Sequence, residues 1–142
     1  MARYILFMKP NISSEAYGEG PSADAAERMG AFNQELQDAG VLLALDGLAP
    51  PSEGARVRFS GGTPTVTDGP FAEAKELIGG YWIIQAKDKA EAIEWARRVP
   101  DVQGDEFEIE VRRIYDMEDF AEDVQEAATL REGEPPAQPL ER

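Results

Sequence analysis

Two stretches of the chain are apolar at successive positions, and each predicts a strand that is buried on both faces. Residues 4–8 read Tyr-Ile-Leu-Phe-Met, and residues 81–86 read Tyr-Trp-Ile-Ile-Gln-Ala. Apolar runs of this length, without regular alternation, are typical of strands that have no side in water. A third run, at 41–45, ends at Asp46-Gly47 and predicts a further strand.

Two segments between these strands carry apolar residues at helical spacing. The first starts after Ser22, a residue suited to cap a helix, and stops at Gly40. Its apolar residues lie three or four positions apart: Ala25, Met29, Phe32, Leu36 and Ala39. The second begins at Asp88, which with Glu91 has the spacing of a capping box, and ends at Pro100. Each segment predicts one helix.

The remaining segments are more polar. Residues 56–59 and 64–67 flank Ser-Gly-Gly at 60–62, which predicts a hairpin with one face in water. Residues 107–115 alternate apolar with charged side chains and predict a strand with one solvated face. Residues 11–21 show no period, so we expect a loop there, a candidate lid over a site.

After the last strand, Asp116 is expected to cap a third helix with apolar residues at near-helical spacing. Residues 131–142 are expected to form a flexible tail. A chain of 142 residues fits one core, so residues 1–130 are expected to be a single domain.

Four principal strands with two helices between them predict a ferredoxin-like α+β fold, with a β-hairpin insertion and a C-terminal helix added to it. In this fold both helices lie on one face of an antiparallel sheet, and residues 4–8 and 81–86 form its central strands. Each large side chain left in water forfeits about 1.5–3 kcal/mol. We therefore expect a homodimer in which two sheets face each other. The alternative is that the third helix folds back over the open face.

Charge and composition narrow the possible partners. The formal net charge is −14, from 28 acidic and 14 basic residues, and it would repel phosphate backbones and anionic lipids. No partnership with nucleic acid or membrane is expected. The N-terminal apolar run is too short for a signal sequence, and no stretch approaches the roughly 20 apolar residues of a membrane span. These features favour a cytoplasmic protein.

The chain contains neither cysteine nor histidine. Thiolate catalysis, zinc sites with sulfur ligands and the commonest general base are therefore excluded. Acid/base chemistry would fall to carboxylates, lysine or tyrosine. We expect no metal site and no cofactor.

One passage resembles the signature of a known family. Asp68-Gly69-Pro70-Phe71 is followed by Glu-Ala-Lys-Glu at 73–76 and by Gly79-Gly80, which lead into a strand. This order is similar to the DGPF motif of the YCII-related family. Further likeness is spread over about four-fifths of the chain, at 4–8, 39–48, 92–100 and 108–112.

The resemblance implies a ferredoxin-like domain that dimerises as an α/β barrel, in agreement with the burial of the central strands. Many members look like accessories encoded beside sigma factors, which implies a transcription-related protein partner. Some relatives are thought to use a His-Asp pair for acid/base chemistry. This chain lacks the histidine, so only Asp68 matches that pair.

Asp68 has two interpretations. A carboxylate desolvated in a pocket could shuttle a proton for a small substrate. Alternatively, aspartate begins a turn by accepting backbone N–H bonds, and Gly-Pro then directs the chain.

Tyr81 and Trp82 point to opposite faces of their strand, so one of them should line the space between facing sheets, either as a pocket floor or as core. The remaining candidate ligand-binding residues are Gly69, Pro70, Phe71 and Lys75.

Two functions follow from these residues. The first is a dimeric small-molecule-binding or regulatory accessory protein. The second is a cofactor-free acid/base enzyme of lyase or isomerase type that uses Asp68. The first function is favoured, because the chain has no histidine or cysteine to take part in catalysis.

Overall fold

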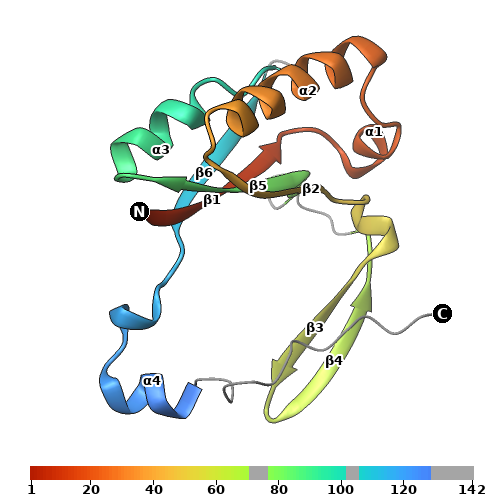
Figure 1. Ribbon diagram of the computed structural model, residues 1–142. Coiled ribbons are helices and arrows are strands. Elements are labelled where there is room, and N and C mark those ends of the chain that lie inside the picture. Colours follow the sequence, from red (N-terminus) through yellow and green to blue (C-terminus); the bar gives the residue numbers. More distant parts are fainter. Residues whose placement is uncertain (71–76, 102–105, 129–142) are drawn as a thin grey trace, which may run out of the picture.

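A four-stranded antiparallel sheet forms the centre of the protein (Figure 1). The computed structural model describes residues 1–70, 77–101 and 106–128. The strands are β1 (Ala2–Pro10), β2 (Leu42–Gly47), β5 (Gly80–Ala86) and β6 (Phe107–Arg113), and their order is β2-β5-β1-β6. Each neighbouring pair is antiparallel. The prediction that the first apolar run and the Tyr81 run are central is confirmed, and the fold is of the mixed α+β class.

Helices α2 (Ala23–Asp38) and α3 (Lys89–Ala96) lie on one face of this sheet (Figure 1). Both begin at the predicted caps. The Ser22 hydroxyl accepts from the amide of Ala25 at 3.1 Å, and the Asp88 carboxylate accepts from the amide of Glu91 at 2.9 Å. Each cap satisfies a backbone donor that has no partner inside its helix.

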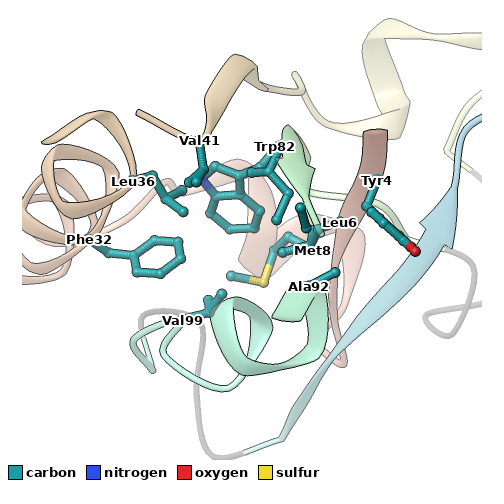
Figure 2. Packing of buried hydrophobic residues seen from close by; sticks show 11 residues of the cluster. Tyr4, Leu6, Met8, Phe32, Leu36, Val41, Trp82, Ala92 and Val99 are labelled. Carbon is teal, nitrogen blue, oxygen red and sulfur yellow. The ribbon is translucent and has the colours of Figure 1, made fainter. Parts of the chain in front are cut away.

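Alternate residues of the central strands face these helices and form the core (Figure 2). Trp82 lies edge-on to Phe32 of α2, with ring centroids 5.6 Å apart. Leu6 and Ile84 are fully buried. The helix-facing residues of β6 also pack against this cluster, which agrees with the alternation predicted for that strand.

The opposite face of the central strands is also apolar. Ile5 pairs with Ile83, and Phe7 pairs with Tyr81. These side chains keep intermediate exposure in the single chain, because α2 and α3 cover only the other face (Figure 1). Between its edge strands β2 and β6 the sheet stays open, and the part of the chain that the structure describes forms no closed barrel.

Strands β3 (Ala55–Ser60) and β4 (Thr63–Asp68) form the predicted hairpin. Its turn contains Gly61 and Gly62, both at positive φ, a conformation that glycine adopts easily. The expectation of one wet face is wrong, because every residue of both strands is exposed. The hairpin extends from the side of the sheet opposite the two helices (Figure 1) and forms a separate two-stranded sheet.

Two other predictions need correction. The segment expected to be a loop contains a short helix, α1 (Ser14–Gly18), because the Ser13 side chain caps it by accepting from the amide of Ala16. The third helix is interrupted. Asp116 caps the 3-10 turn η3 (Met117–Asp119), and α4 (Glu122–Ala128) starts separately.

Helix α4 contacts η3 and lies away from the sheet (Figure 1). A further 3-10 turn, η1 (Pro51–Glu53), precedes the hairpin. Strand β6 ends two residues earlier than predicted, and the expected tail lies outside the described residues. None of the helices in the described ranges has the length and apolarity needed to span a membrane.

Candidate functional site

A cavity of about 540 Å³ lies where α1 and α2 meet the ends of β2 and β5. It is on the helix side of the sheet, since Met8 and Trp82, whose side chains face the helices, line it. Cavities of this size hold small organic ligands. Most of its other lining residues are apolar or glycine, among them Ala25, Ala26, Met29, Leu45, Leu48 and Pro50.

Tyr17 of α1 forms one wall of the cavity. Its hydroxyl donates to the carbonyl oxygen of Gly79 at 2.8 Å and also lies against the carbonyl oxygen of Leu48. Burial raises the pKa of the Tyr17 phenol above its ordinary value, so the hydroxyl keeps its proton at neutral pH. The short helix is thereby tied to the ends of two strands.

Asn33 of α2 and Trp82 of β5 form another part of the cavity wall. The indole N–H of Trp82 donates to the side-chain oxygen of Asn33 at 2.8 Å. Asn33 lies one turn of helix from Met29 and from Leu36, on the face that packs on the sheet. The bond thus holds a polar amide at the boundary between core and cavity.

Tyr81 and Asp46 lie on the other face of the same two strands, where they pair directly across β5 and β2. The Tyr81 hydroxyl donates to the Asp46 carboxylate at 2.7 Å. This hydrogen bond, followed by partial desolvation and the charge of Asp46, raises the pKa of Tyr81. Both residues also border the cavity, so its rim joins the two faces of the sheet.

The close approach of the β2 backbone explains why position 80, the second residue of the Gly79-Gly80 pair, is glycine. A Cβ atom at Gly80 would lie 2.7 Å from the carbonyl oxygen of Asp46 and 3.2 Å from the Cα of Gly47. Strand β2 can approach β5 this closely only if position 80 has no side chain. Glycine is therefore needed where the cavity rim is formed.

Asp68, the aspartate of the DGPF motif, lies outside the cavity. Asp68 is the exposed last residue of β4 and is not among the residues that line the cavity. Next to it, the amide of Gly69 donates to the carbonyl oxygen of Gly54 at 3.0 Å. A Cβ at Gly69 would lie 1.7 Å from the carbonyl oxygen of Pro51, so this position too requires glycine.

The structure thus brings together only part of the predicted site. Tyr81 and Trp82 border the cavity, and they point to opposite faces as predicted. The cavity itself is on the helix side of the sheet rather than on the open face. Pro70 is exposed near the end of the hairpin, while Phe71 and Lys75 lie outside the described residues.

Sequence reasoning missed Tyr17 and Asn33. Tyr17 sits in a segment without period, where only the Ser13 cap signals a helix. Asn33 left a clearer signal, because it is a polar residue at helical spacing from Met29 and Leu36, on an otherwise apolar stripe.

Comparison with known proteins supports the family resemblance that the DGPF motif indicated. Residues 2–118 match the YCII-related domain. An uncharacterised protein of Rhizobium meliloti (strain 1021) is 33% identical over 86 residues, which cover 61% of this chain and 69% of that protein. The matched domain includes the sheet, both covering helices and every cavity-lining residue. The chain therefore belongs to the YCII-related family.

Proposed function

We propose that this protein binds a small molecule in the cavity beside Tyr17 and acts as a dimeric accessory protein. The observation that carries the proposal is the cavity itself, about 540 Å³ in volume and lined mainly by apolar groups with a few placed polar ones. This combination is typical of small-molecule sites.

The walls of the cavity are held in place before any ligand arrives. Tyr17 links α1 to the carbonyl of Gly79, and Trp82 links β5 to Asn33. A site whose walls are already ordered pays less entropy on binding. This favours recognition of a defined ligand over non-specific adsorption.

The second part of the proposal is a homodimer, with two open sheet faces meeting as in an α/β barrel. The open face presents Ile5, Phe7 and Ile83 at intermediate exposure. The hairpin and α4 extend on that side of the sheet (Figure 1), and they expose Phe59 by 75% and Val124 by 45%. A second copy would cover these apolar groups.

Two variants of α2 test the ligand site. Ala26 lines the cavity, so Ala26→Phe should fill part of it, whereas Ala31 is exposed on the same helix and is not a lining residue. In a thermal-shift screen of small metabolites, compounds that stabilise the wild type should also stabilise Ala31→Phe and should fail with Ala26→Phe. If the compounds that stabilise the wild type stabilised Ala26→Phe equally well, the proposal that ligands bind in this cavity would be contradicted.

The alternative function is cofactor-free acid/base catalysis by Asp68. This carboxylate is exposed at the end of the hairpin, so the reaction would need a pocket completed by another part of the assembly. Asp68→Asn tests it, because loss of turnover with unchanged unfolding would support a proton-transfer role. If Asp68→Asn kept its turnover, the role of Asp68 would be to form the turn.

We also propose a transcription-related protein partner, on the basis of the family resemblance.

A further inference from the structure

We propose that the cavity selects an uncharged, mostly apolar ligand that presents one hydrogen-bond acceptor to the side-chain amide of Asn33. The inference rests on the proposed function and specifies the chemical class of its ligand. Its basis is the hydrogen bond between Asn33 and Trp82 together with the charges around the cavity.

The orientation of the Asn33 amide follows from the chemistry of its partner. An indole N–H is only a donor, so the atom of Asn33 that lies 2.8 Å from it must be the oxygen. The NH₂ group then points away from Trp82. In the part of the chain that the structure describes, it has no protein acceptor. Asn33 therefore offers donors to whatever occupies the cavity.

Among the described lining residues, the other side-chain donors are already engaged. Tyr17 directs its proton to the backbone carbonyl of Gly79, and the Asp46 carboxylate accepts the proton of Tyr81. Among the described lining residues, Asn33 is thus the side chain that has a hydrogen-bond donor to spare. A ligand acceptor placed against it would satisfy a partly buried donor.

Charge argues for a neutral ligand. Among the described residues that line the cavity there is no lysine or arginine, and Asp46 is the one acid. A carboxylate in this cavity would lose hydration without gaining a cation, and the net charge of −14 opposes its approach. An ammonium group has no lone pair to offer the Asn33 donor, and Asp46 lies with Tyr81 on the opposite face of the sheet, at the rim of the cavity.

The test uses four probes of similar shape on the full chain, all substituted at the same ring position: methyl naphthyl ketone, the amine made from it by reductive amination, ethylnaphthalene and naphthoate. Affinities are measured by fluorescence titration at neutral pH. The ketone should bind about three- to tenfold more tightly than the hydrocarbon, as one net hydrogen bond allows. Naphthoate should bind more weakly than both.

The variant Asn33→Asp retains an oxygen for the indole of Trp82 and replaces the donor by a second oxygen. It should abolish the preference for the ketone and favour the amine made by reductive amination of that ketone. Gln37→Glu adds the same charge at an exposed position of α2 and should leave the wild-type preference intact. The wild-type comparison decides the matter even if Asn33→Asp does not fold.

The outcomes separate the inference from the proposed function. Equal binding of ketone and hydrocarbon, or tighter binding of naphthoate or of the amine to the wild type, would overturn the inference and leave a ligand cavity in place. If none of the naphthyl probes bound, the inference would be overturned, and the thermal-shift screen of the wild type and Ala26→Phe would still decide the proposed function.

Discussion

The hydroxyl of Tyr17 donates a hydrogen bond to the carbonyl oxygen of Gly79, 2.8 Å away, although 62 positions separate the two residues in the chain. The same hydroxyl lies against the carbonyl oxygen of Leu48. One side chain thereby connects α1, the segment after β2 and the segment before β5. Five expected outcomes follow from this contact and from others in the fold.

Tyr17→Phe should lower the free energy of unfolding by about 1–2 kcal/mol, because the carbonyl oxygen of Gly79 loses its donor in a partly buried contact. Ligands of the cavity should also bind more weakly, since the wall that contains α1 is no longer held. Urea unfolding measures the first effect. The matched control is Tyr115→Phe at a side chain that is 66% exposed, and equal losses in the two variants would contradict the role of the hydrogen bond.

The same phenol predicts a loss of stability in alkali. Its pKa is raised in the folded protein above the ordinary 10.0, so its stabilising contribution is complete below that pH and is lost as the pH rises through the folded pKa. The pKa of Tyr81 is raised as well, first by its bond to Asp46. Urea midpoints measured from about pH 8 to about pH 11 should fall less steeply in Tyr17→Phe. An unchanged slope would show that Tyr17 does not contribute.

Gly80→Ala should destabilise the protein by about 1–3 kcal/mol, as overpacking does, because the new Cβ would meet the carbonyl oxygen of Asp46 at 2.7 Å. Gly30→Ala is the matched control within α2, where a Cβ meets nothing within 4 Å. It should raise stability by about 0.5–1 kcal/mol through helix propensity. Thermal unfolding of both variants measures the contrast, and a neutral Gly80→Ala would contradict the close approach of β2.

The proposed dimer predicts a solution mass twice that of the 15.6 kDa chain. Phe7→Asp places a charge on the open face and should shift the protein toward monomer, while the core on the helix side stays intact (Figure 2). Light scattering after gel filtration measures the mass, and far-UV circular dichroism checks the fold. Gln37→Asp, at an exposed position of α2, should remain dimeric. A wild-type monomer at micromolar concentration would refute the dimer.

Arg113 and Asp119 form a two-pronged ion pair, with bonds of 2.8 and 3.1 Å, that holds η3 against the end of β6. The guanidinium of Arg113 lowers the pKa of Asp119, and the amide of Asp116 lowers it further. The pair should therefore stabilise η3 above the ordinary carboxyl pKa of 3.8 and lose that effect as the pH falls through the lower folded pKa. Carboxyl NMR titration measures this pKa, which Arg113→Gln should move back toward the ordinary range.

Much of the secondary structure was predictable because its signals are local. Ser22 and Asp88 mark helix starts through bonds to amides three residues away. The Gly61-Gly62 turn marks the hairpin through backbone conformations that glycine adopts easily. The interruption after Asp119 was missed because the spacing of apolar residues does not show that the Asp119 carboxylate is engaged by the amide of Asp116 and by Arg113 at the end of β6.

By itself, the sequence determined the α+β class, the central position of the two apolar strands and the family, because periodicity, caps and a contiguous motif are encoded over short spans of chain. Only the tertiary structure decided that the cavity lies on the helix side of the sheet, between Tyr17 and Asn33, and that Asp68 is outside it. The reason is physical. The cavity joins residues from α1, α2, β2 and β5, and no local pattern specifies which of their side chains meet.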